Sequence, residues 1–387
     1  MSVTVRRAAS ADADAICTVV EAQLEPEDAA EARYTLQGPL ARADQWLVAE
    51  VDGSVAAFCC GCPCDLRIGS VTMPALNVEF VATAEGHEGR GLQRALFEAL
   101  PGAFPDALVH LITGIPYFYR RLGYEYAIPI PDRFEADRPA LPDGWTTRVA
   151  TADDIPLLMS LQAEVQAHAD VALTHTTDQW AWLVPSPNYT IAIAEGPDGP
   201  AMARGYRGDP DTSWVMEVAA PSEAGAAAAI HGAAEGFDRV AVMDRPADPA
   251  DLAGSLGGDR HPSRYAYYLK VVDVPAVLDG LRPELDGRLA ASGLEPPDTL
   301  KLDLYTSWVD LPVVDGAFGP PEVGRRGGFE ADRIGVPPDL VAHLLLGPLG
   351  GTAMDDRHAD VRTRERAALF GALFPPLVAD VHSWIVP

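Results

Sequence analysis

The chain has 387 residues, 48% of them hydrophobic, which is enough for two or three domains with ordinary cores. Its 29 basic and 56 acidic residues give a formal net charge of −27 without a basic stripe, so we expect no nucleic-acid partner. No apolar run reaches the roughly 18 residues of a membrane helix and no apolar leader opens the chain, so we expect a cytoplasmic protein with no membrane partner.

Five cysteines are present, four of them between Cys59 and Cys64 and the fifth at Cys17. This distribution does not suit a disulfide framework, and it favours a reducing cytoplasm. The run CCGCPC resembles a metal cluster, but zinc sites need paired spacings and a second pair elsewhere. Cys60, Cys62 and Cys64 alternate along an extended segment, so we expect buried thiols and no metal site.

The first elements follow a strand–helix–helix–hairpin order. We expect a strand over Val3–Arg7 and a helix over Ala11–Glu21, capped by Ser10 and acidic in its first turn. A second helical segment follows near Asp28–Arg42. The run WLVAEVDGSVAAFCCG then predicts a hairpin with Asp52-Gly53 as a type I′ turn, because both residue types tolerate positive φ.

The run VEFVATAEGHEGRGLQRALFEAL, residues 78–100, predicts an apolar strand, a turn and a helix that starts near Gly89, Arg90 and Gly91. Glycines there let backbone N–H groups approach a ligand, and the helix N-terminus adds partial positive charge, a combination that binds phosphate. The spacing fits neither a P-loop nor a dinucleotide-binding GxGxxG. Three further strands and a short helix ended by Gly123 are expected at Arg67–Pro74, Leu108–Gly114, Tyr124–Ile128 and Tyr117–Leu122.

Two of these runs resemble motifs of the GNAT superfamily of acetyl-CoA-dependent N-acetyltransferases. VATAEGHEGRGLQRAL is similar to motif A, [QR]xxGx[GA], with Gly91 at its central glycine, whereas Glu88 and Gln93 depart from the usual residue types. ITGIPYFYRRLGYEYA, residues 112–127, resembles motif B and lies at a suitable distance downstream. The order of the predicted strands and helices is also that of the GNAT fold.

The chain repeats itself after a proline-rich segment, residues 129–143, which we interpret as a linker. RVATADDIPLL echoes RAASADADAI, and SWVMEVAAPSEAGAAAAIHGAAEGF echoes the motif A region with PSEAGAA in place of the glycine loop. Pro221 removes an N–H donor there and Glu223 adds an anion. The repeat therefore predicts a second GNAT-like domain that lacks a cofactor site.

From Tyr265 the pattern changes to a strand, a proline-initiated helix ended by Gly293, and further strands and helices. This piece resembles the sterol-carrier-protein-like domain. Two GNAT modules followed by that domain form the layout of the enhanced intracellular survival (Eis) family. The predicted fold is therefore α/β (α+β), with a catalytic GNAT domain at residues 1–131, a second GNAT-like domain at 132–264 and a sterol-carrier-protein-like domain at 265–387; each GNAT domain has a mixed central sheet flanked by helices.

The resemblance implies acetyl-CoA as co-substrate and indicates its contacts. In the family, the strand backbone pairs with the pantetheine arm and the loop amides hold the pyrophosphate, and Eis-like enzymes make a further contact just before motif B. By matching position, the expected acetyl-CoA-binding residues are Val81, Ala82, Thr83, Gly89, Arg90, Gly91, Leu92, Gln93, Arg94, Gly114 and Ile115.

Amine acetylation also needs a proton donor for the leaving thiolate and a base for the amine. Tyr119 lies in FYRRLGY, where GNAT enzymes, Eis members included, carry a tyrosine acid, and an ordinary tyrosine pKa near ~10 keeps it protonated at pH 7. The resemblance to Eis places the terminal carboxylate, here that of Pro387, in the active site. Glu79 is the alternative base, since it lies on the strand that would hold the cofactor.

The sequence therefore predicts an N-acetyltransferase in which a primary amine attacks acetyl-CoA directly in a ternary complex. The acidic balance and the Eis resemblance favour a small cationic acceptor, and the same resemblance implies a homo-oligomer. Two alternatives stay open. One is a non-catalytic acyl-CoA-binding protein with a decayed GNAT site, and the other is a lipid-binding protein led by its C-terminal domain.

Overall fold

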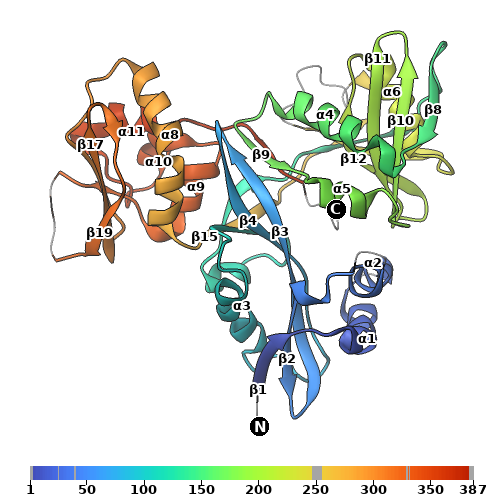
Figure 1. Cartoon of the computed structure of the whole chain (residues 1–387), viewed down its shortest axis with the longest axis horizontal. Coiled ribbons are helices and arrows are strands. Elements are labelled where there is room, and N and C mark those ends of the chain that lie inside the picture. Colours follow the sequence, from blue (N-terminus) through green and yellow to red (C-terminus); the bar gives the residue numbers. More distant parts are fainter. Residues whose placement is uncertain are drawn as a thin grey trace.

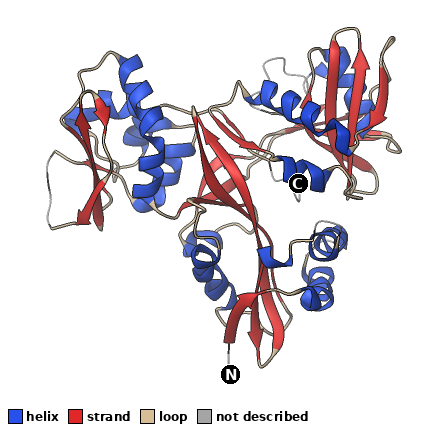
Figure 2. Cartoon of the chain, in the orientation of Figure 1, coloured by secondary structure: helices blue, strands red, loops and turns tan. Residues whose placement is uncertain are grey.

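The computed structural model describes residues 3–24, 26–38, 41–245, 255–327, 330 and 332–382. Three lobes meet around the upper end of a long hairpin formed by β3 (Ser54–Ile68) and β4 (Val71–Thr83) (Figure 1). The first lobe, at the bottom of the view, carries the N-terminus; the second lies at the upper right and the third at the left. Each lobe combines helices with a sheet (Figure 2).

Among the described residues, the strands form three sheets. The first sheet has the path β1-β2-β3-β4-β5-β15-β6, with β9 paired to β3 and β21 paired to β9. All pairs along the path are antiparallel except β4–β5, which is parallel. Its strands, besides β3 and β4, are β1 (Val3–Arg7), β2 (Trp46–Val51), β5 (Val109–Ile112), β6 (Glu125–Pro129), β9 (Val171–Thr174), β15 (Ala266–Val271) and β21 (Ala379–Asp380).

The second sheet repeats this plan with the path β8-β10-β11-β12-β13-β7-β14, in which only β12–β13 is parallel. Strands β8 to β13, apart from β9, therefore occupy the places that β1 to β5 occupy in the first sheet. These strands are β7 (Arg133–Asp137), β8 (Thr146–Val149), β10 (Tyr189–Gly196), β11 (Gly199–Tyr206), β12 (Thr212–Ala219), β13 (Arg239–Met243) and β14 (Asp259–His261).

The two sheets exchange one strand each. In the first sheet, β15 lies between β5 and β6, although the chain forms it only after the whole second sheet. In the second sheet, β7 lies between β13 and β14, although it directly follows β6. We call β7 and β15 the exchanged strands. The predicted range 132–264 thus contains every strand of the second sheet, whereas β15 and β21, from the predicted range 265–387, join the first; the division into three domains stays a prediction.

Helices flank the sheets as amphipathic or alanine-rich segments. In the first lobe α3 buries Leu92, Leu96, Phe97 and Leu100 on one face, and in the second α6 packs through alanines. The helices of the first two lobes are α1 (Ala13–Gln23), α2 (Pro26–Gln37), α3 (Leu92–Ala103), α4 (Ile155–Gln166), α5 (Thr177–Leu183) and α6 (Glu223–Ala233).

The third lobe packs α8 (Val274–Ser292), ended by Gly293 at φ 66°, against a small sheet and three short helices. Its strands are β16 (Thr299–Asp303), β17 (Ser307–Val314), β18 (Ala317–Phe318), β19 (Glu322–Arg325) and β20 (Ile334–Gly335), and its further helices are α9 (Val341–Leu346), α10 (Gly350–Arg357) and α11 (Ala367–Leu373). The apolar core of this lobe is continuous with Leu66, Met73 and Leu111 of the first sheet, so the third lobe is anchored on the upper end of the β3–β4 hairpin.

Three local predictions were wrong. The range Arg67–Pro74, predicted as one strand, contains the turn between the end of β3 at Ile68 and the start of β4 at Val71. Ser10 does not cap α1, because it lies in a 3-10 turn and the helix begins only at Ala13. The turn is held instead by Asp12, which accepts N–H groups from Arg6 at 2.7 and 2.9 Å and from Ala9 at 2.7 Å. The segment 129–143, interpreted as a linker, contains the exchanged strand β7.

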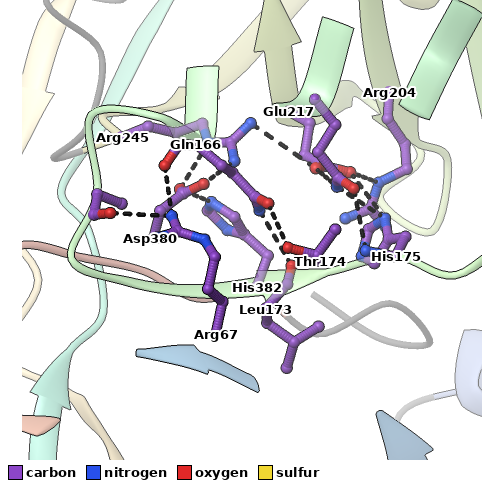
Figure 3. Close-up of polar contacts among 12 residues, drawn as sticks. Arg67, Gln166, Leu173, Thr174, His175, Arg204, Glu217, Arg245, Asp380 and His382 are labelled. Atoms are coloured by element: carbon purple, nitrogen blue, oxygen red, sulfur yellow. Dashed lines mark hydrogen bonds and ion pairs between the residues drawn. The ribbon is translucent and has the colours of Figure 1, made fainter. Parts of the chain in front are cut away.

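A buried polar network joins the C-terminal segment to the second lobe (Figure 3). Asp380, which follows the third lobe, accepts Arg245 Nε–H at 2.8 Å, and Arg245 Nη1 lies 3.7 Å from Glu217. Glu217 accepts Arg204 Nε–H and Gln162 Nε2–H, both at 2.8 Å. The four charged side chains are at most 4% exposed, so the chain is tied firmly to the second lobe as far as residue 380.

No helix in the described ranges is both long and apolar enough to cross a membrane.

Candidate active site

The site is built where two parallel strands of the first sheet separate. β4 and β5 pair only from Ala75 to Asn77, opposite Val109 to Leu111. Beyond that point β4 carries a bulge, and Phe80 takes φ 50°, a conformation that a non-glycine residue adopts only at a cost. Among the described residues no strand pairs with β4 beyond Asn77 on its β5 side, so the backbone of its last residues can pair there with an extended ligand.

A cavity of about 570 Å³ opens at this gap. It is lined by β4, by the glycine loop and start of α3, by the segment around the 3-10 helix η3 (Tyr119–Leu122), and by the end of α1. Ten predicted site residues line it: Val81, Ala82, Thr83, Gly89, Gly91, Leu92, Gln93, Arg94, Ile115 and Tyr119. Residues from three separate segments therefore converge on one cavity of a size suited to a small-molecule ligand.

The loop before α3 offers backbone donors to this cavity. Gly89 and Gly91 have φ values of 70° and 79°, which only glycine adopts readily. A side chain added at either glycine would meet no atom within 4 Å, so the backbone there stands open. Gly91 is the N-cap of α3, and no side chain caps the helix. The free N–H groups and the positive end of the helix dipole suit a phosphate group.

The two departures from motif A have different structural consequences. The Gln93 side chain reaches back to β4, where its Nε2–H donates to the Ala82 carbonyl at 2.7 Å and lies 3.1 Å from Thr83 Oγ1. Gln93 thus connects the start of α3 to the end of β4, and it forms part of the cavity wall. Glu88 is exposed and lines the cavity beside the glycine loop, and nothing in the structure explains why it is acidic. Arg90 donates to the Gly86 carbonyl at 2.6 Å, which braces the loop.

Tyr119 lies at the inner wall of the cavity and is 3% exposed. The ring is held among aromatic neighbours, with centroid distances of 5.0 Å to Phe118, 5.5 Å to Tyr268 and 5.6 Å to Phe97. Burial, followed by the nearby Glu79 carboxylate, raises the pKa of Tyr119 above its ordinary value. The hydroxyl therefore stays protonated at neutral pH and can donate a proton.

Gly114 does not line the cavity but sets the position of Tyr119. Its φ is 140°, and an added Cβ would lie 3.0 Å from the Tyr119 ring and 3.1 Å from its hydroxyl. Ile115, 65% exposed, follows it at the cavity mouth. Only glycine permits this approach of the β5–η3 segment to the ring.

The two candidate bases lie far apart in the chain, one on β4 and one at the C-terminal end of the sequence. Glu79 is 6% exposed on β4 and accepts Asn77 Nδ2–H at 2.6 Å. Its negative charge adds to burial in raising the pKa of Tyr119. Pro387 lies outside the described residues, whereas the chain before it is fixed at Asp380 and at His382, whose Nε2 lies 3.1 Å from Asp380.

The corresponding region of the second lobe is closed. Ser222 caps α6 by accepting the Gly225 N–H at 3.2 Å, so this helix start is already satisfied. A side chain added at Gly225 would lie 2.8 Å from Trp145, which is 5% exposed and packs against the loop. Trp145 and the serine cap leave the second repeat without the open glycine loop found in the first.

Several cavity-lining residues escaped sequence analysis: Gln23, Leu24, His87, Phe118, Arg121 and Leu122. Phe118 and Leu122 flank Tyr119 within motif B, so their helical spacing could have been used. Gln23 and Leu24 come from the end of α1, and no local signal indicates that this end meets β4.

The five cysteines are all free and buried, with Cys60 and Cys62 sulfur atoms 3.5 Å apart. Burial, the leading cause, raises the pKa of both thiols.

The strand order, the split between β4 and β5 and the open loop before α3 define a mixed α/β protein with the fold of GNAT acetyltransferases. Residues 4–127 match the model of the acetyltransferase (GNAT) domain family. A comparison with curated proteins finds no match.

Solved structures with the same fold cover nearly the whole chain. A GCN5-related N-acetyltransferase from Anabaena variabilis has a TM-score of 0.69 and 17% identity, covering 96% of this chain and 97% of its own. One from Kribbella flavida has a TM-score of 0.63 and 18% identity, covering 97% and 95%. Eis1 from Mycobacterium abscessus has a TM-score of 0.56 and 16% identity, covering 98% of each chain. The similarity to Eis1 thus extends over all three lobes as a likeness of fold.

Proposed function

We propose that the protein is an acetyl-CoA-dependent N-acetyltransferase that acetylates a primary amine. The observation that carries the proposal is the single cavity at the β4–β5 split, lined by both the open glycine loop and Tyr119. The proposal is supported by the match of residues 4–127 to the model of the GNAT family, which uses acetyl-CoA as co-substrate. The loop amides would take the pyrophosphate, and the backbone of Val81 to Thr83 would take the pantetheine arm.

The reaction would be a direct transfer. The amine nitrogen attacks the thioester carbonyl carbon, and the carbon–sulfur bond breaks as the amide forms. Tyr119 gives its proton to the departing thiolate, and a base takes the proton that the amine loses. Because the pKa of Tyr119 is raised above its ordinary value, the acid form persists across the working pH range, and the loss of this proton should not limit activity at moderately alkaline pH.

The base would be either Glu79 or the terminal carboxylate of Pro387. Glu79 is supported by its electrostatic interaction with Tyr119. The terminal carboxylate is proposed from the fold shared with Eis1 alone. Adding residues after Pro387 distinguishes the two candidates, because it displaces the terminal carboxylate and leaves Glu79 in place. An unchanged kcat would assign the role of the base to Glu79 or to another internal group.

The acceptor, in our proposal, is a small cationic amine, consistent with the formal charge of −27, which attracts cations. We further propose, from the fold shared with Eis1 alone, that residues 265–387 are a sterol-carrier-protein-like domain and that the chain forms a homo-oligomer in the cytoplasm. Sedimentation of the purified protein tests the assembly.

The decisive experiment compares the wild-type chain with Tyr119→Phe on a panel of amines. Loss of the general acid should lower kcat by roughly 10²–10⁴-fold while calorimetric acetyl-CoA affinity is retained. Tyr265→Phe is the matched control, since Tyr265 is exposed and outside the cavity lining. Full activity in Tyr119→Phe would reject the acid assignment. Tight acetyl-CoA binding without turnover on any amine would favour a non-catalytic acyl-CoA-binding protein, a reading that Glu88 at the cavity supports.

A further inference from the structure

The exchanged strand β15 contacts Tyr119, the proposed general acid, through its residue Tyr268. Tyr268 of β15 is fully buried between β5 and β6, opposite Ile112 on one side and Tyr126 on the other. Its hydroxyl accepts the backbone N–H of Tyr117 at 2.7 Å. A side chain more than a hundred residues distant in sequence is thus bonded to the segment that carries Tyr119.

The segment that receives this hydrogen bond is conformationally demanding. Tyr117 has φ 68° although it is not glycine, and its side chain is 66% exposed. Such a conformation is unfavourable for a residue other than glycine and persists only where surrounding contacts impose it. The bond from the Tyr117 N–H to Tyr268 is a contact of that kind, since the exposed Tyr117 side chain has little packing of its own.

The Tyr268 ring also contacts Tyr119 itself. It stacks on Tyr126, with centroids 3.9 Å apart and an interplanar angle of 23°, and meets Tyr119 edge-on at 5.5 Å and 60°. Tyr126 thus packs against the Tyr268 ring and holds it in place, and the Tyr268 ring in turn contacts Tyr119. A second residue of β15 acts on the same segment, because Lys270 Nζ–H donates to the Leu122 carbonyl, at the end of η3, at 3.0 Å.

We propose that Tyr268 is a positioning residue for Tyr119, so that the candidate active site of the first lobe is completed by a strand formed only after the second lobe. The hydroxyl fixes the backbone two residues before Tyr119, and the ring contacts the Tyr119 ring edge-on. The catalytic consequence rests on the proposed function, in which Tyr119 is the acid; the geometric consequence does not.

Tyr268→Phe is the sharpest test, because it removes the hydrogen bond and keeps the stacked ring. One net hydrogen bond corresponds to roughly a 2- to 13-fold effect, so we expect kcat to fall by about 3- to 10-fold while the calorimetric Kd for acetyl-CoA changes by less than about twofold. Tyr268→Leu, which also removes the ring contact, should lower kcat further. Tyr267→Phe is the control, since this neighbouring side chain packs on the opposite face of the strand, in the core of the third lobe.

A cycle of variants distinguishes positioning from general destabilisation. If Tyr268 acts through Tyr119, then Tyr268→Phe should lower kcat in the wild-type chain and have no further effect in the Tyr119→Phe chain. Equal effects in both backgrounds would overturn the proposal, as would an unchanged kcat in Tyr268→Phe and Tyr268→Leu.

A measurement independent of activity separates this proposal from the proposed function. In protein labelled with ¹³C on tyrosine rings, the Tyr119 resonance is assigned by its loss in Tyr119→Phe. We expect Tyr268→Phe to shift or broaden it, and Tyr267→Phe to leave it in place. A wild-type chain that acetylates no amine but shows this shift would reject the function and keep the positioning role. A wild-type chain that acetylates amines, combined with a Tyr119 resonance that does not move in Tyr268→Phe, would keep the proposed function and reject the positioning role.

Discussion

Glu88 places a carboxylate at the wall of the cavity where the pyrophosphate of acetyl-CoA would lie. Removing one like charge near a helix N-terminus is worth about 0.3–1 kcal/mol, which corresponds to a roughly 2- to 5-fold change in affinity. We therefore expect Glu88→Gln to bind acetyl-CoA more tightly by that factor in calorimetry at low salt, with the gain shrinking at high salt.

The matched control is Glu85→Gln, which removes an exposed carboxylate of the same loop outside the cavity lining. Equal gains in both variants would show that only the net charge matters. Weaker binding in Glu88→Gln would show instead that the carboxylate makes a favourable contact with the ligand.

Glu31 of α2 is a second residue with a testable charge. It is fully buried against the second lobe, where it accepts a hydrogen bond from the Asn188 side chain. Burial raises the pKa of Glu31 to about 8. The folded chain therefore holds this proton more tightly than the unfolded chain, whose ordinary glutamate pKa is near ~4.3.

The sign of the pH dependence follows from this difference. The stabilising contribution of protonated Glu31 is present in full below the unfolded pKa and is lost as pH rises toward about 8. We expect Glu31→Gln, which mimics the protonated form, to remove this loss, so that its thermal midpoint exceeds that of the wild type by more at pH 9 than at pH 5. A constant difference between the two chains across this range would contradict the assignment.

At the residue scale, cavity-lining residues within one local motif were predictable from the sequence, whereas contacts between distant segments were not. The positive φ of Gly89 and Gly91 follows from the glycine-rich run, and Tyr119 follows from motif B. Tyr268 could not be found in this way, because its contact with Tyr119 depends on a pairing between strands that are far apart in the chain. Likewise, nothing in the local sequence indicates that Gln93 turns back to β4.

At the element scale, the strands and helices were largely predictable, whereas their sheet membership was not. The hairpin turn at Asp52-Gly53 has the two positive φ values of a type I′ turn, as predicted from its residue types. The repeat also indicated the order of strands in the second lobe. Yet alternation and turn signals predict only that β7 and β15 are strands, and do not indicate which sheet each one joins.

The C-terminal strand β21 shows how a charged network fixes an element that local pairing alone holds weakly. β21 pairs with β9 over Ala379 and Asp380 only. Burial alone would raise the pKa of Asp380, but the Arg245 guanidinium and His382 hold it well below the ordinary range. The carboxylate is therefore ionised at all working pH values, and its stabilising contribution is lost only as the medium becomes strongly acidic.

Removing one charge of the Arg245–Asp380 ion pair should lower the free energy of unfolding more than replacing both residues with apolar ones. Asp380→Asn takes away the negative charge that faces buried Arg245, at a cost of about 3–5 kcal/mol in the free energy of unfolding. The double variant Arg245→Met, Asp380→Leu removes both charges and should lose markedly less. Urea unfolding followed by fluorescence measures both, and a double variant less stable than Asp380→Asn would show that the network stabilises the fold by more than charge balance.

At the scale of the whole molecule, the lobes are not independent units. The core beneath α1 and α2 includes Trp180, Trp182 and Tyr189 of the second lobe, so this face of the first lobe is buried by its neighbour. The exchanged strands add a second dependence, because the chain supplies β7 to the second sheet directly after β6 of the first, and supplies β15 to the first sheet only after the second sheet is complete. Composition and length indicated several domains, and no property of the sequence indicated that their sheets are interlocked.

This interlocking predicts how the first lobe behaves alone. A chain ending at residue 131 lacks β15, so β5 and β6 lose the strand that pairs with both. Buried strand edges without partners promote aggregation. We expect this chain to be largely insoluble and, where soluble, to bind acetyl-CoA far more weakly than the full chain.

The geometry also indicates how to restore the sheet without the second lobe. Ala266 lies opposite Pro129, and the Ile130 N–H donates to the Tyr265 carbonyl at 3.0 Å, so the end of β6 and the start of β15 are adjacent. Joining residue 130 to residue 265 through Asn-Gly, and ending at residue 273, would convert the exchanged strand into an ordinary hairpin partner.

We expect this joined chain to have a higher soluble fraction and tighter acetyl-CoA binding than the chain ending at 131. The gain should remain below the full chain, because the face that packs on Trp180 and Trp182 is still exposed. Equal solubility and affinity in the two short chains would mean that β15 is dispensable, and that the dependence between the lobes lies in the apolar face alone.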